Sequence, residues 1–295
     1  MRVTDPDFRL TDHSRPVILE GFLAESEVVR QWSFDFLSER FGDTRVKVVE
    51  PDETGVRQAR FQELADYIAE VRSGAEKYVM GSASFFESNG ALLEGFDLPR
   101  LQQMIGRRII RLETFIGTAG SGSSFHCAGI GNLFCQLHGQ KRWRFVPPAW
   151  SPWMYPEFGK NPYAVHVTSP IRTDRYQEQR EDYPLFEHAP HFHALLEPGD
   201  VLFNPAWWWH EVENLGETIG VPIRVVTTPL TNPSFMSMAA LSFMTSKEFL
   251  QVFVPLFRKV CGLEPKKERP DQELFLTDES PVLDAAIQDF YDRAK

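Results

Sequence analysis

The chain has 295 residues, with 31 lysines and arginines against 41 aspartates and glutamates, and a formal net charge of −10. Hydrophobic residues make up 42% and charged residues 24%, values of a folded globular protein that exclude a disordered, collagen-like or coiled-coil chain. An acidic chain lacks the clustered cations that nucleic acids and anionic membranes attract, so we expect neither as a partner.

Apolar residues recur at helical spacing over residues 25–41 and again over residues 58–73, which predicts two helices. Alternating residues between them predict a strand over 44–49. We expect residues 1–105 as a whole to form a helical and strand region that packs on the rest of the chain.

Short β-like runs separated by turn residues begin near residue 107 and favour a sandwich or small barrel over an alternating βαβ sheet. We expect residues 106–230 to form this β core, with a long proline-rich insertion at 147–190 of the kind that often covers a site. Residues 231–295 are predicted to be C-terminal helices, which could form a homodimer contact.

Cysteine usage and hydropathy indicate a cytoplasmic protein. The three cysteines form no Cys-x-x-Cys pair, and their odd number does not suggest a disulfide framework. The N-terminus has no apolar core of signal-peptide length, and no apolar run reaches the roughly 18 residues of a membrane-spanning helix.

The segment PGDVLFNPAWWWHEVEN carries the most specific pattern in the chain. Its spacing of Gly199, Pro205, His210 and Asn214 resembles a conserved motif of cupin barrels, with Trp207 where many cupins have glycine. A neutral imidazole in an aromatic-walled cavity can hold a divalent transition metal. The alternative, a histidine that only packs in the core, does not account for the full spacing.

A second segment, SSFHCAGIGNLFCQLHGQKRW, places His126 on a predicted strand, Asn132 six residues later and Lys141 fifteen residues later. Alternation puts Lys141 on one strand face with Trp143 and Phe145. A lysine among aromatic side chains needs an anionic partner to offset its desolvation. The alternative is a surface lysine on an edge strand.

Together the two segments resemble the JmjC and cupin-8-type Fe(II)/2-oxoglutarate-dependent oxygenases, a family that includes the asparaginyl hydroxylase of hypoxia-inducible factor. The resemblance covers about residues 109–229. It implies a mainly β fold with flanking helices, built on a double-stranded β-helix, or jelly-roll, barrel. It also implies Fe(II), 2-oxoglutarate and O2 as cofactors.

The resemblance implies roles for individual residues. His126 and His210 match the two metal-ligating histidines. The positions that match the co-substrate site are Lys141, Asn132, Ser123 and, more loosely, Arg224.

One position departs from the family pattern. The metal-binding acid belongs two residues after His126, where this chain has Ala128. A chloride or bromide ion could fill that place, as in the non-haem iron halogenases, which makes Ala128 a catalytic position together with His126 and His210. Alternatively, water or a more distant acid completes a two-histidine hydroxylase, or the barrel only binds a ligand.

Two acids, Glu113 and Glu211, lie near predicted barrel strands and are candidates to replace the missing carboxylate. Glu211 directly follows His210 and should point to the opposite face of the strand, whereas Glu113 could face inward. The resemblance thus implies an oxygenase that hydroxylates an unactivated C–H bond of a small-molecule or peptidyl substrate. The alternatives are a halogenase and an inactive binding module.

Overall fold

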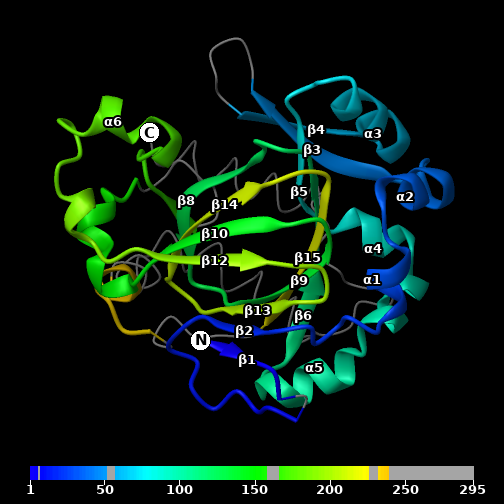
Figure 1. The fold of residues 1–295 in the computed structure, drawn as a ribbon, viewed down its shortest axis with the longest axis horizontal. Coiled ribbons are helices and arrows are strands. Elements are labelled where there is room, and N and C mark those ends of the chain that lie inside the picture. The colour runs from blue at the N-terminus through cyan, green and yellow to red at the C-terminus, as the bar shows by residue number, and fades with distance from the viewer. Residues whose placement is uncertain (6, 52–56, 158–165, 226–231, 239–295) are drawn as a thin grey trace, which may run out of the picture.

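The computed structural model describes residues 1–5, 7–51, 57–157, 166–225 and 232–238, and Figure 1 shows their arrangement. Most of the predicted C-terminal helical region, and the homodimer contact expected of it, lies outside these residues. No helix in the described part of the chain is long and apolar enough to cross a membrane.

Two β-sheets form the centre of the molecule and confirm the predicted mainly β fold. The strands of the larger sheet, in spatial order, are β1 (Arg2–Val3), β2 (Val17–Leu19), β13 (Val201–Asn204), β9 (Asn132–His138), β15 (Thr218–Val225), β7 (Thr114–Gly117), β5 (Tyr78–Ser82), β3 (Arg45–Pro51) and β4 (Arg57–Glu63), and β6 (Ile109–Leu112) also pairs with β15. The strands of the smaller sheet are β11 (His166–Thr168), β8 (Gly122–Ala128), β14 (Trp209–Asn214), β10 (Lys141–Val146) and β12 (Phe192–Leu196).

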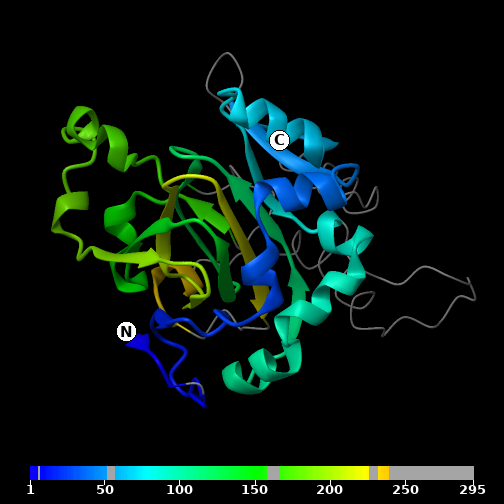
Figure 2. The same ribbon diagram turned by 45° about the vertical axis from the view of Figure 1, so that its right-hand side comes forward.

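Helices cover one side of the two sheets and the long insertion covers the other (Figures 1 and 2). The helices on the first side are α1 (Glu27–Gln31), α2 (Phe34–Phe41), α3 (Leu64–Arg72), α4 (Ser84–Ser88) and α5 (Leu98–Ile105), with the 3-10 turn η1 (Gly90–Phe96). The insertion holds the 3-10 turns η2 (Pro148–Met154), η3 (Thr173–Arg175) and η4 (Phe186–His188), strand β11 and helix α6 (Tyr176–Gln179).

The alternation of side chains along β9 shows how the layers are built. Leu133, Cys135 and Leu137 are fully buried in the cluster that joins the larger sheet to the helices. Phe134 leaves the opposite face and packs with Trp143 of the smaller sheet. Burial on both faces accounts for the apolar run over residues 133–135 in the middle of this strand.

Two predictions for the first 105 residues need correction. The helix predicted over 25–41 is divided at Trp32 and Ser33, where the Ser33 hydroxyl accepts a hydrogen bond from the backbone N–H of Phe36 and begins α2. The helix predicted over 58–73 is only α3. The residues before it form β4 because they pair along their whole length with β3, which confirms the strand predicted at 44–49.

Candidate functional site

Two histidine side chains from neighbouring strands lie against each other between the sheets. His126 on β8 and His210 on β14 are directly opposite in the antiparallel register, so their side chains leave the same face. The centroids of the two rings are 4.1 Å apart. The indole of Trp143 stacks on His210 at 5.6 Å and forms an aromatic wall. The two imidazoles are therefore close enough to bind one ion.

Backbone carbonyl groups fix which ring nitrogen each histidine presents. Nδ1 of His126 lies 2.8 Å from the carbonyl oxygen of Ser124, and Nδ1 of His210 lies 2.9 Å from that of Trp208. A carbonyl only accepts, so Nδ1 carries the proton and Nε2 keeps the lone pair in both rings. Metal-ligating histidines are commonly oriented by such contacts. The donor set therefore suits a transition metal.

The third place of the expected ligand set has no acid. Ala128 lies two residues after His126 on the same strand face. Within the described ranges, no group of three or more histidine, cysteine, aspartate or glutamate side chains is placed to hold a metal ion. The structure thus brings together the two histidines at ligand positions of the family pattern, without the acid.

Glu211 does not replace the missing acid. As the sequence predicts, its side chain leaves the strand face opposite to that of His210. Its carboxylate pairs with Arg144 at 2.6 Å and accepts a hydrogen bond of 2.5 Å from the Thr173 hydroxyl. Glu211 therefore ties the smaller sheet to the insertion.

Glu113 is buried between two arginines. Nε and Nη2 of Arg224 donate to one of its carboxylate oxygens at 3.0 and 2.7 Å, and Arg111 pairs with the other. Burial alone would raise the pKa of Glu113, but the two guanidinium groups outweigh it and hold that pKa below its usual value. Arg224 is therefore engaged by this carboxylate, and its predicted contact with the co-substrate stays a prediction.

Lys141 is fully buried without a carboxylate partner in the described part of the chain. Its ammonium group donates to the side-chain oxygen of Asn214, to the Thr218 hydroxyl at 3.1 Å and to the Tyr78 hydroxyl at 3.4 Å. Burial lowers its pKa from 10.5 to about 7. Three neutral oxygens compensate the desolvation of the ammonium only in part, so the site is suited to an anion.

The register places Lys141 and the histidines on one face of the smaller sheet. Phe145 is opposite His210, and Lys141 is opposite Asn214. Because alternate residues of a strand share a face, the lysine side chain lies on the face of the histidine pair, with Trp143 between them. An elongated dianion could contact both.

A β-bulge brings Ser123 to the same face. His126 is opposite His210, but Ser123, three residues earlier, is opposite Val212, only two residues after His210. The extra residue in β8 shifts the alternation by one position. Ser123 therefore shares a strand face with His126, which a regular strand would not allow at this spacing.

Several buried polar atoms near the histidines have no hydrogen-bond partner among the described residues. They are Oδ1 of Asn132, Oδ1 of Asn204, Nε1 of Trp143 and Oγ1 of Thr168. Thr168 is opposite His126 in the register. Each such atom costs about 1–3 kcal/mol when left unsatisfied. Their position around the ring pair fits a site built to surround a bound polar group.

Sequence reasoning missed Asn204 and interpreted it only as part of a turn with Pro205. Its side-chain nitrogen lies 3.3 and 3.4 Å from the two ring nitrogens of His210. The signal available in the sequence was a polar residue at the end of an apolar strand, in the same segment as His210.

Trp207 has a left-handed backbone, with φ of +67°, at the position where many cupins have glycine. Its backbone N–H donates to the carbonyl oxygen of Ala128 at 2.7 Å. A non-glycine residue in such a conformation costs about 1–3 kcal/mol. The turn persists because the indole is fully buried, and it fixes the start of β14 against the end of β8.

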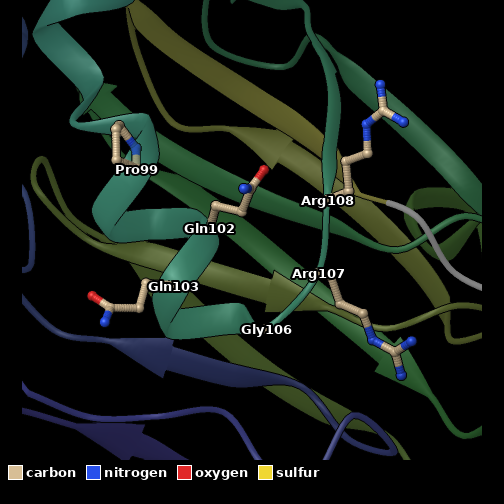
Figure 3. Close-up of a pocket in the computed structure, with 6 residues that line it drawn as sticks. All are labelled: Pro99, Gln102, Gln103, Gly106, Arg107 and Arg108. Carbon is tan, nitrogen blue, oxygen red and sulfur yellow. The ribbon is translucent and has the colours of Figure 1, made fainter.

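A surface pocket of about 400 Å³ lies elsewhere, at the C-terminal end of α5. Figure 3 shows the residues that line it, with the guanidinium groups of Arg107 and Arg108 pointing away from each other. Its lining contains no histidine, cysteine or acid and only these two charged residues. The histidine pair is therefore the stronger candidate site.

Comparison with known families identifies the model of the cupin-like domain, Cupin_8, which matches residues 8–224. Among curated proteins, the lysine-specific demethylase JMJ21 of Arabidopsis thaliana is 26% identical over 232 residues, which are 71% of this chain and 23% of that protein. The arginine-specific demethylase JMJ22 of the same plant is 27% identical over 222 residues, or 72% of this chain and 42% of that protein.

The chain thus spans less than half the length of these curated relatives.

Among solved structures, the chain is similar to Escherichia coli YcfD. That structure is described as a ribosomal oxygenase in complex with cobalt and 2-oxoglutarate, and the similarity covers 95% of this chain and 63% of that chain. The TM-score is 0.46 and the sequence identity 17%.

Proposed function

Because the chain belongs to the cupin-like domain family (Cupin_8), we propose that it is a 2-oxoglutarate-dependent oxygenase whose Fe(II) is held by His126 and His210. The proposed reaction is hydroxylation of an unactivated C–H bond. The names of the two plant relatives specify lysine and arginine as their targets, which favours a peptidyl substrate over a small molecule.

Lys141 is the observation that carries this proposal. A fully buried ammonium group, surrounded by neutral oxygens, lies on the sheet face of two adjacent imidazoles. A dicarboxylic acid satisfies both ends of this arrangement, because one carboxylate can neutralise the lysine while the other reaches the metal. Charge-assisted hydrogen bonds of this kind are about twice as strong as neutral ones.

The chain's own residues would bind, orient and shield the reactants. When bound, Fe(II) and 2-oxoglutarate would supply the O2 activation that oxidises the substrate. Trp143 and Phe145 exclude water from the face that carries the histidines, which strengthens the electrostatic contacts there. The backbone carbonyls of Ser124 and Trp208 keep both Nε2 atoms available.

The direct test is to add 2-oxoglutarate to the Fe(II)-loaded protein without O2, and then to admit O2. We expect a weak visible charge-transfer absorption in the first step and succinate in the second. His126→Ala and His210→Ala should abolish both signals. His193→Ala, at an exposed histidine of the neighbouring strand β12, should keep them. Wild-type protein without absorption or succinate would favour the inactive binding module.

The effect of chloride on the charge-transfer absorption distinguishes a hydroxylase from a halogenase. If a halide occupied the place of the missing acid, chloride would shift the absorption, and Ala128→Asp would remove that shift. We expect no shift from chloride.

A further inference from the structure

Two arginines lie directly opposite each other at one end of a polar row across the larger sheet. Arg111 on β6 is opposite Arg224 on β15, Arg224 is opposite Asn132, and Asn132 is opposite Asn204. We propose that Arg224 binds a carboxylate of the peptidyl substrate, a few residues away from the residue that is oxidised. This inference rests on the proposed function, because it concerns the substrate of the same site.

The row lies on the face of the larger sheet that is turned toward the smaller sheet. Ile223, the neighbour of Arg224 on β15, is fully buried in the cluster that joins the larger sheet to the helices. Because successive side chains of a strand leave opposite faces, Arg224 points to the side of the smaller sheet. At the other end of the row, the side-chain nitrogen of Asn204 lies 3.3 Å from Nδ1 of His210. The arginine therefore shares a face with the residues that surround the histidine pair.

Arg224 shares its acidic partner with a second arginine. Like charges that are directly opposite each other in a sheet repel, as those of Arg111 and Arg224 do. Glu113 contacts both guanidinium groups, and the charge of Lys47 also helps to lower the pKa of this carboxyl group. A single carboxylate cannot neutralise both arginines, and Arg224 pairs with no other acid in the described part of the chain. Its surroundings therefore favour a further anion.

The guanidinium group of Arg224 also has N–H donors left for that anion. Nε and Nη2 both donate to one carboxylate oxygen of Glu113, which uses one side of the planar group and fixes its orientation. Nη1 donates to no group among the described residues, and with the second hydrogen of Nη2 it forms a pair of parallel donors. Such a pair matches the two oxygens of a carboxylate. The side chain is 26% exposed, so a substrate can reach it.

The co-substrate is not the anion that this site awaits. A Cβ atom added to Gly220 of β15 would lie 3.2 Å from Cε of Lys141, so Gly220 marks the lysine end of the site. Arg224 lies four residues further along β15, or about 13 Å at a rise of 3.3 Å per residue. One carboxylate of 2-oxoglutarate would be at Lys141 and the other at the metal, which leaves neither for Arg224.

The place of Arg224 predicts where the acid lies in the substrate. Two strand spacings, or about 10 Å, separate Arg224 from Asn204, which contacts His210. An extended peptide covers this distance in about three residues. We therefore expect an aspartate or glutamate roughly two to four positions from the residue that is oxidised.

The test selects random dodecapeptides, displayed on phage, on the full chain loaded with Co(II) and 2-oxoglutarate, without turnover. Wild-type protein should enrich Asp or Glu at least fivefold at a fixed distance from a second selected residue, and Arg224→Gln should lose this enrichment. Arg142→Gln removes an exposed arginine from the other face of the smaller sheet and should keep it.

Affinities of the best peptide then measure the contact itself. Replacing its acid by glutamine should weaken binding to the wild type at least tenfold, but binding to Arg224→Gln less than twofold. That variant should fold, because Glu113 keeps Arg111 as a one-to-one partner. Arg224→Lys keeps the charge but not the paired donors, and should bind the acidic peptide at least threefold more weakly than the wild type. Both variants should bind 2-oxoglutarate within twofold of the wild type.

The other outcomes overturn the inference in distinct ways. Wild-type protein that selects no peptide, or peptides without an acid, would contradict it, and so would an acid preference that survives in Arg224→Gln. A loss shared with Arg142→Gln would assign the preference to overall charge, and wild-type affinity in Arg224→Lys would refute the paired contact. A tenfold loss of 2-oxoglutarate affinity in Arg224→Gln would assign the arginine to the co-substrate. Wild-type protein that binds no 2-oxoglutarate with Co(II) would instead defeat the proposed function itself.

Discussion

Lys141 carries a charge in a place where its own chain supplies no negative partner among the described residues. Its pKa is lowered by burial to about 7, whereas a lysine in an unfolded chain titrates near 10.4. Below pH 7 Lys141 is protonated in both the folded and the unfolded protein, and the folded protein bears the full cost of desolvating the ammonium group. Between about pH 7 and 10 only the unfolded state keeps the proton, so the free energy of unfolding of the ligand-free protein should rise with pH.

The same shift predicts a proton uptake on binding of 2-oxoglutarate. The dianion favours the ammonium form, so the Co(II)-loaded protein should take up nearly one proton per ligand at pH 8 and almost none at pH 6. The affinity should fall up to tenfold per pH unit above about pH 7. Calorimetry in two buffers of different ionisation enthalpy measures the uptake.

Lys141→Met is the control for this titration, because it removes the charge at similar length. The variant should bind 2-oxoglutarate weakly and without the pH dependence. An unchanged proton uptake in Lys141→Met would show that another group titrates.

Strand β15 shapes the lysine site from the larger sheet. Gly220 of β15 faces the site, and a Cβ atom there would lie 2.6 Å from Cε1 of Phe134 and 3.2 Å from Cε of Lys141. Gly220→Ala should therefore displace the Phe134 ring and, by a smaller amount, the side chain of Lys141 that packs beside it. We expect a loss of about 1–3 kcal/mol in the free energy of unfolding. We also expect 2-oxoglutarate affinity to fall at least tenfold while Co(II) affinity stays within twofold.

Gly216→Ala is the matched control, because nothing lies within 4 Å of the added Cβ in the turn before β15. It should leave both affinities unchanged. If Gly220→Ala weakened Co(II) and 2-oxoglutarate equally, the separation of the two subsites would be wrong.

The sequence predicted correctly which side chains of a strand are buried where one face is apolar and the other is charged. On β10 the side chains of Lys141, Trp143 and Phe145 are buried while Arg142 and Arg144 are not, as alternation indicated. The helix predicted over 58–73 was wrong in its first half, because pairing with β3 overrides a helical pattern that short segments also produce by chance. The β-bulge in β8 could not be predicted from the types of its residues, because it is a shift in the register with the partner strand β14.

At the scale of the whole molecule, residues of the candidate site come from both sheets. The smaller sheet contributes the histidine pair and Lys141, and the larger sheet contributes Asn132 and Asn204. Family spacing was enough to select the first group and Asn132, because those residues lie in two motifs. It could not predict Asn204, because its place beside His210 depends on how one sheet packs on the other.

We propose that two imidazoles of this chain, those of His126 and His210, hold one ion. X-ray absorption of the Co(II)-loaded full chain counts imidazole ligands directly through their characteristic multiple scattering. We predict two imidazoles with the remaining ligands oxygen, and one imidazole in His210→Ala if that variant is loaded at high Co(II) concentration. A wild-type spectrum with fewer than two imidazoles, or with sulfur bound to the ion, would contradict the account.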